Sequence, residues 1–224
     1  MSPTLPALAR LNEKYQIIVA SGSPRRKEIL TKLGLEFRVA VSTFPEDLDK
    51  SLYTPDEYVL QTALGKATEV YRRVRRSNNL TEDHRPILVI AADTVVIHNE
   101  RIIEKPISNA HAKEMLRGLA GREHVVATAI VLAYAVDEEG NLKVETAVER
   151  SKVLFDEMDD ELIDAYVATG EPLDKAGGYG YQGLAAAFIP RIDGCYYNVI
   201  GFPVNRFVRT ATNLLNTQSG GDQQ

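Results

Sequence analysis

The stretch Ile17-Ile18-Val19-Ala20-Ser21-Gly22-Ser23-Pro24-Arg25-Arg26 sets the fold class and marks the first part of a candidate site. Its β-branched start predicts a short strand, and Ser23 and Pro24 are typical of a helix N-cap and a first helical position. The backbone N–H groups and the positive dipole end of such a helix favour an anion, and Arg25 and Arg26 can reach phosphate oxygens there. The same residues fit a capped surface helix with solvated arginines equally well.

The composition is that of an ordinary globular protein, with 224 residues, of which 44% are apolar and 25% are charged. A net charge of −5 argues against broad electrostatic binding of nucleic acid. The longest apolar runs are too short or too interrupted to span a membrane, and the first eleven residues lack the continuous apolar core of a signal peptide. The single cysteine, Cys195, allows no internal disulfide and fits a reducing compartment. We therefore expect a cytoplasmic protein with neither a membrane nor a nucleic-acid partner.

Strand and helix patterns alternate along the chain, but hairpins interrupt a strict strand-helix-strand order. Beyond the opening strand, strands are expected at 37–41, 87–92, 102–103, 125–135 and 142–155, and helices at 24–33, 54–76, 108–119, from 159 or 160 to 170, and near the C-terminus. These patterns predict an α/β fold with a mixed sheet. We expect a single domain over residues 17–216, with an N-terminal extension at 1–16 and a disordered tail at 217–224.

Asp93 comes directly after the near-continuous apolar run at 87–92. Ligand sites in α/β sheets form at strand ends, and a carboxylate there can bind a divalent metal or accept a proton from water. The short strand at 102–103 can bring Glu104 and Lys105 back beside Asp93, which would mix metal-binding and phosphate-binding groups. Taken alone, these residues fit a turn-capping aspartate and a solvated strand end.

The segment 171–183 is rich in glycine, which lets a backbone approach a ligand closely. It matches the G-x-G-x-x-G pattern, but no strand precedes it and no clear helix follows it, so a dinucleotide fold is not predicted. Lys175 can add positive charge, Asp174 can hold Lys175 in place, and the Gln182 amide can read a base edge. An exposed glycine-rich turn is the alternative.

Five motifs occur in one order along the chain: Ala20-Ser-Gly-Ser-Pro-Arg-Arg26, Ala92-Asp-Thr-Val-Val96, Glu104-Lys-Pro106, Glu171-Pro-Leu-Asp-Lys-Ala-Gly177 and Gly194-Cys-Tyr-Tyr-Asn-Val-Ile-Gly-Phe-Pro203. Together they resemble the Maf family of nucleoside triphosphate pyrophosphatases. The resemblance implies an elongated α/β fold with two lobes that flank a nucleotide-binding cleft, often in a homodimer. It also implies hydrolysis between the α and β phosphates, with Mg²⁺ or Mn²⁺ as cofactor.

Carried onto this chain, the resemblance implies a role for each matched residue. Substrate would be bound by Ser21, Arg25, Arg26, Thr94, Lys175 and Gln182, and catalysis would involve Asp93, Glu46, Lys66, Glu104 and Lys105. Within the second group, Asp93 is the expected proton acceptor, and Glu46, Asp93 and Glu104 are the expected metal ligands. The acid in the segment 46–49 stays open, because Asp47 and Asp49 are neighbouring carboxylates.

The resemblance also divides substrates into a branch acting on dTTP, UTP and related pyrimidines and a branch favouring 7-methyl-GTP. Arg25, Thr94 and Gln182 match the first branch, so pyrimidine nucleoside triphosphates are the expected substrates. Pyrophosphatases of 7-methyl-GTP or ITP are alternatives that keep the reaction. A nucleotide-binding regulator of cell division without useful turnover is an alternative from another class, but such a binder does not need the acids Asp93, Glu46 and Glu104.

Overall fold

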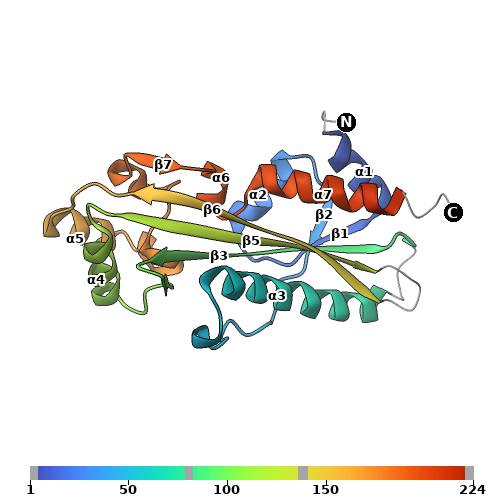
Figure 1. The fold of residues 1–224 in the computed structure, drawn as a ribbon, viewed down its shortest axis with the longest axis horizontal. Helices are drawn as coiled ribbons and strands as arrows, with labels where there is room; N and C mark the ends of the chain where they lie inside the picture. The colour runs from blue at the N-terminus through green and yellow to red at the C-terminus, as the bar shows by residue number, and fades with distance from the viewer. Residues whose placement is uncertain (1–4, 79–82, 136–140, 220–224) are drawn as a thin grey trace.

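The computed structural model describes residues 5–78, 83–135 and 141–219. In these residues, one mixed sheet runs along the length of an elongated molecule (Figure 1). The strand order is β2-β1-β3-β5-β6-β7, and β4 pairs with β3. The strands are β1 Gln16–Val19, β2 Phe37–Val39, β3 Ile87–His98, β4 Arg101–Ile103, β5 Glu123–Ala135, β6 Leu142–Leu154 and β7 Arg191–Asp193. Only the β1–β2 and β1–β3 pairs are parallel. The predicted mixed α/β fold is confirmed.

Helices cover both faces of this sheet (Figure 1). They are α1 Pro6–Lys14, α2 Pro24–Lys32, α3 Pro55–Asn78, α4 Asn109–Leu119, α5 Asp160–Ala168, α6 Tyr196–Val199 and α7 Val204–Ser219. Helices α1, α2 and α7 lie on one face, α3 lies on the other, and α4 and α5 lie at the far end (Figure 1). Short 3-10 turns join the later elements: η1 Lys50–Leu52, η2 Glu171–Asp174, η3 Ala176–Gly178 and η4 Leu184–Phe188.

Strand β3 is buried on both sides because helices cover both faces of the sheet. Leu88 and Ile90 belong to the core beneath α1 and α7, whereas Val89 and Val95 belong to the core against α3. Since side chains alternate along a strand, neighbouring residues of β3 face opposite layers. This near-continuous burial explains the unbroken apolar run in the sequence.

A gap in the pairing of β3 creates the opening for a site. The pairing of β3 with its parallel partner β1 ends at the pair Val19–Ile90. Further along β3, the pairing with its antiparallel partner β4 starts at the pair Val96–Ile103. Between these points β3 stays paired with β5 only, and Asp93 lies in this interval. The prediction that the strand ends before Asp93 is therefore wrong: β3 continues to His98, and the strand that ends is its neighbour β1.

Local sequence signals place the helix starts correctly. Thr54 and Glu57 form the predicted capping box, in which the Glu57 N–H donates to Thr54 Oγ1 and the Thr54 N–H donates to Glu57 Oε2. Ser108 and Asp159 cap α4 and α5. At the C-terminus α7 runs to Ser219, further than expected, and the rest of the predicted tail lies outside the described residues. The tip of the β5–β6 hairpin also lies outside the described residues. The domain boundaries stay a prediction.

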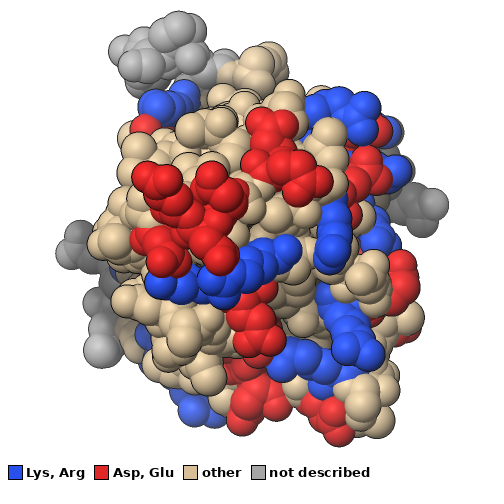
Figure 2. Space-filling model, turned by 90° about the vertical axis from the view of Figure 1, so that its left-hand side faces the viewer, with Lys and Arg blue, Asp and Glu red and all other residues tan. Residues whose placement is uncertain are grey.

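The end of the molecule formed by α4 and α5 carries charges of both signs (Figure 2). Arg117 pairs with Asp160 at 2.7 Å, and Lys113 pairs with Asp164 at 2.7 Å, so ion pairs join the two helices. Acidic and basic side chains interleave on this face, which is not the pattern of a broad nucleic-acid surface. None of the helices in the described ranges has the length and apolarity to cross a membrane.

His124 is buried in the aromatic core between β5 and the 3-10 turns, and its Nε2 lies 2.7 Å from the Tyr179 hydroxyl. Burial, with a smaller effect of nearby His98, lowers the pKa of His124 from 6.5 to about 4. The unfolded chain therefore binds a proton that the folded protein does not. We expect the free energy of unfolding to fall as the pH drops from 6.5 to about 4, by up to ~1.4 kcal/mol per pH unit. Urea titrations of the wild type and His124→Gln check this, since the variant should lose this part of the slope; an unchanged slope would contradict it.

Candidate active site

The turn between β1 and α2 forms one wall of a cleft above the gap in the sheet. Ser23 caps α2, its side chain accepting a hydrogen bond from the Arg26 N–H, and Pro24 lies in the first turn of the helix. This confirms the predicted helix start. The N-terminal N–H groups and the dipole of α2 favour negative charge at this wall. Arg25 and Ser21 line the cleft beside it.

Arg26 is fixed by three acceptors from three parts of the chain. Its Nε donates to the Gly201 carbonyl oxygen at 2.9 Å, and its terminal nitrogens donate to Ser21 Oγ at 3.3 Å and Thr94 Oγ1 at 3.0 Å. Thr94 Oγ1 lies a further 3.0 Å from Thr128 Oγ1 on β5. Burial lowers the pKa of Arg26 from its ordinary value of 12.5. The guanidinium is therefore oriented before any ligand arrives.

Lys66 of α3 lies between two carboxylates, on the side of β3 that faces α3. Its Nζ is 2.7 Å from Asp93 Oδ1 and 2.9 Å from Glu46 Oε1. The side chains of Lys66 and Asp93 are only 10% and 11% exposed, whereas that of Glu46 is 55% exposed. Because desolvation offsets most of the attraction in a buried ion pair, such a pair adds little net stability. The three residues come from α3, β3 and the segment 42–53. Because burying their charges costs free energy and adds little stability, the arrangement indicates a functional role.

Glu104 lies in a side pocket of about 290 Å³ that shares Asp93 and Glu46 with the cleft. Its Oε1 is 2.9 Å from Lys50 Nζ and accepts a hydrogen bond from the Tyr58 hydroxyl at 3.3 Å. Burial and the charge of Glu104 raise the pKa of Tyr58 to about 12, so the phenol stays protonated. The expected return of the strand at 102–103 toward Asp93 thus occurs, but Glu104 is held by other partners.

The turns η2 and η3, with Lys175 between them, form another part of the cleft lining. Lys175 Nζ is 2.6 Å from Asp174 Oδ1 and 2.7 Å from the Glu171 carbonyl oxygen, which confirms that Asp174 holds Lys175. Gly177 has a φ of 70°, and a Cβ there would stand 2.8 Å from a Val96 methyl group on β3. Only glycine allows η3 to approach the sheet this closely.

These walls enclose one cleft of about 560 Å³, a volume typical of a small-molecule site. Nine predicted site residues line it: Ser21, Arg25, Arg26, Glu46, Lys66, Asp93, Thr94, Lys105 and Lys175. Five of them are cationic, and they outnumber the three acids of the whole lining, Glu46, Asp93 and Asp174, in a protein of net charge −5. Such a concentration of positive charge favours a polyanionic ligand.

Gln182 is the predicted residue that the structure leaves apart. It is exposed and does not line the cleft or the side pocket. The turn that carries it is held to η2, since the Leu184 N–H donates to Glu171 Oε2 at 3.0 Å. A role of Gln182 in reading a base stays a prediction.

The sequence gives no signal for two residues of the side pocket, Lys50 and Tyr58. Lys50 follows a run of acidic residues, which is typical of a solvated surface segment. Tyr58 is at a core position of α3, which indicates packing. Their link to Glu104 depends on contacts between segments far apart in the chain.

Fold and site together define an α/β protein with a cationic cleft that contains a buried carboxylate–ammonium group. The family model described as Maf-like protein matches residues 16–214, and the chain belongs to that family. It is 44% identical over 194 residues to a dTTP/UTP pyrophosphatase of Bacillus cereus strain AH820, covering 87% of this chain and 93% of that protein. It is 40% identical over 212 residues to a human probable bifunctional dTTP/UTP pyrophosphatase/methyltransferase protein. That match covers 93% of this chain and a third (33%) of the human protein's length.

Proposed function

We propose that this protein is a nucleoside triphosphate pyrophosphatase that hydrolyses dTTP and UTP to the nucleoside monophosphate and pyrophosphate. One observation carries the proposal: five cationic side chains line the same cleft as the buried Glu46–Lys66–Asp93 group. The cations suit a triphosphate, and the carboxylates suit the activation of water. The names of the relatives, at 40–44% identity, support the pyrimidine substrates.

The proposed division of labour follows the walls of the cleft. Arg25 and Arg26 at the start of α2 bind phosphate oxygens, together with Lys105 and Lys175, which line the same cleft. Asp93 accepts the proton of the water that attacks phosphorus, and Lys66 fixes the position of the Asp93 carboxylate. Because the reaction needs little covalent chemistry from the protein, positioning and charge neutralisation supply most of the catalysis.

Pyrophosphatases of this family are in general metal-dependent, so a divalent cation requires carboxylates that converge on one point of the cleft. Across residues 5–78, 83–135 and 141–219, no three His, Cys, Asp or Glu residues lie together as a metal cluster. The predicted trio is therefore not assembled, because Glu104 is paired with Lys50. Glu46 and Asp93 do fit, since both carboxylates converge on one cation, the Lys66 ammonium. They would hold Mg²⁺ or Mn²⁺, and the metal would neutralise phosphate charge.

Pyrophosphate release from a panel of nucleoside triphosphates tests the proposal. We expect rapid release from dTTP and UTP in the presence of Mg²⁺ or Mn²⁺, and little from 7-methyl-GTP or ITP. Release from the latter two alone would keep the reaction and overturn the assigned substrates. Binding of nucleotides without release from any of them would overturn the enzyme and favour a regulator.

A further inference from the structure

Glu46 enters the cleft from the segment 42–53, which we call the strap, and its own contacts do not explain its position. The side chain is 55% exposed, and the one ion pair found for it among the described residues is that with Lys66. A half-exposed ion pair contributes little to stability. The strap holds one short 3-10 turn, η1, so contacts elsewhere along it must place Glu46.

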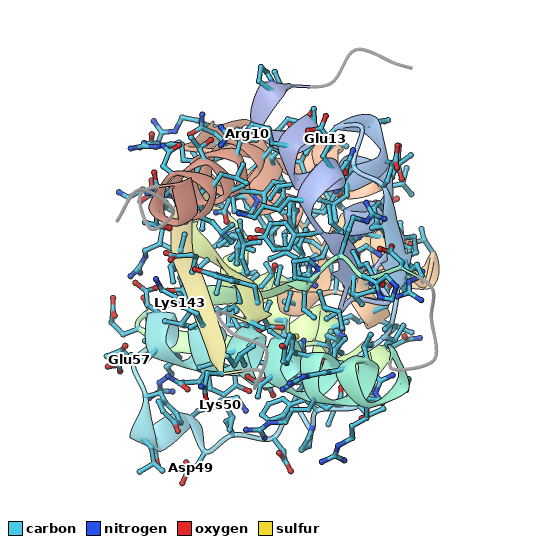
Figure 3. All side chains as sticks on the ribbon, turned by 90° about the vertical axis from the view of Figure 1, so that its right-hand side faces the viewer. Arg10, Glu13, Asp49, Lys50, Glu57 and Lys143 are labelled. Atoms are coloured by element: carbon cyan, nitrogen blue, oxygen red, sulfur yellow. The ribbon has the colours of Figure 1, made fainter. Side chains whose placement is uncertain are left out.

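The two ends of the strap are attached to neighbouring elements. At the start, Ser42 Oγ and the Thr43 N–H both donate to Glu69 Oε2 of α3 at 3.0 Å. Hydrogen bonds from Arg73, Thr43 and Ser42 lower the pKa of Glu69 to about 2, so this anchor stays ionised near neutral pH. At the other end lies the Lys50–Glu104 ion pair. Figure 3 shows Lys50 at the lower side of the molecule, away from α1 and its Arg10.

Between these ends, the ring of Phe44 lies directly on Gly65 of α3. A Cβ built at Gly65 would stand 2.4 Å from Phe44 Cζ and 2.5 Å from both Cε atoms, far inside contact distance. Gly65 does not have a positive φ, so its backbone conformation is open to any residue. Glycine is also less favourable than alanine inside a helix. The close approach of the Phe44 ring is therefore the physical reason for a glycine at this position.

We propose that Gly65 and Phe44 are positioning residues. The contact of the Phe44 ring with Gly65 sets the distance between the strap and α3, so that Glu46 reaches Lys66. The register supports this: Glu69 lies one helical turn after Gly65 on the same face of α3, and Lys66 follows Gly65 directly. Strap residues 42, 44 and 46 thus meet α3 at Glu69, Gly65 and Lys66, within little more than one helical turn. The inference rests on the proposed role of Glu46 in the reaction.

The variant Gly65→Ala tests the inference, with Gly118→Ala as its matched control. Gly118 is also a helical glycine, but a Cβ there would meet no atom within 4 Å. In Gly65→Ala we expect kcat for dTTP to fall at least tenfold with KM within threefold of wild type, because the phosphate-binding residues are untouched. The thermal midpoint should stay close to that of the wild type, because the higher helix propensity of alanine offsets the loss of the Phe44 contact, whereas a purely structural defect would lower it. Gly118→Ala should keep the wild-type kcat.

A second substitution separates the ring-on-glycine contact from other effects of Gly65→Ala. Phe44→Leu removes the Cζ and Cε atoms that a Cβ at residue 65 would strike. In the double variant, we expect at least a third of the wild-type kcat to return. A wild-type kcat in Gly65→Ala, or a double variant no more active than Gly65→Ala, would overturn the inference.

Hydrogen exchange gives a readout that does not depend on turnover. The Thr43 N–H donates to Glu69, and the Phe44 N–H donates to Ser42 Oγ at 3.0 Å. Both amides should exchange at least tenfold faster in Gly65→Ala than in the wild type and in Gly118→Ala. Unchanged exchange would overturn the seating of the strap. If the wild type released no pyrophosphate at all, the proposed function would fail, and faster exchange would still show that Gly65 seats the strap.

Discussion

Asp93→Asn is expected to lower pyrophosphate release from dTTP at least roughly 10³-fold, because the amide cannot accept the proton of the attacking water. The fold should persist, since asparagine has the same shape and Lys66 keeps its ion pair with Glu46. Nucleotide binding should also persist in part, because the cationic walls are unchanged. Steady-state kinetics and calorimetric titration of dTTP measure the two effects.

Asp160→Asn is the matched control for this change. Asp160 forms an exposed ion pair with Arg117 at the α4–α5 end, and such pairs contribute little. Its variant should release pyrophosphate at the wild-type rate. Near-normal turnover in Asp93→Asn would remove Asp93 from the catalytic role, whatever the control shows.

Arg26→Ala is expected to reduce kcat/KM for dTTP roughly 10³-fold, because it removes an oriented guanidinium from the phosphate-binding wall. It should also lower the free energy of unfolding by about 2 kcal/mol, since the Gly201 carbonyl and the Thr94 hydroxyl lose a donor. Arg26→Lys should recover only part of the loss, because an ammonium lacks the fork that reaches several acceptors together. Kinetics and urea unfolding of both variants measure these changes.

An arginine far from the cleft provides the comparison for Arg26. Arg10 is exposed on α1 and lies at the outer surface of the molecule (Figure 3). Arg10→Ala removes the same charge and should leave kcat/KM and stability unchanged. If Arg26→Ala kept a kcat/KM near that of the wild type, Arg26 would have no part in binding the triphosphate.

Structural features that depend on a few residues adjacent in the chain could be predicted from the sequence. The starts of α2, α3, α4 and α5 depend on caps at Ser23, Thr54, Ser108 and Asp159, which act within one turn. The apolar pattern likewise predicts the long β5–β6 hairpin. Most of the cleft lining was predictable because the matched motifs supply its residues together.

Features that depend on distant segments could not be predicted. The sequence predicts Asp93 at a strand end, but whether β3 continues depends on its pairing with β5, and the opening depends on where β1 stops. The sequence predicts Glu104 beside the other acids, yet Lys50 and Tyr58 hold it in the side pocket. Gln182 lies in a turn that is held to η2 by the hydrogen bond from the Leu184 N–H to Glu171 Oε2. The homodimer and the cytoplasmic location stay predictions.

The gap beside β3 has a consequence for the order of folding. The β5–β6 hairpin pairs residues that are close in sequence, so it can form early. The β1–β3 pairing that sets one edge of the gap joins Gln16 to Ile87, across α2, β2 and α3. Contacts between residues so distant in the chain form slowly, because a long loop must close before they yield any stabilisation. We therefore expect the β1–β3 edge of the cleft to form later in folding than the β5–β6 hairpin.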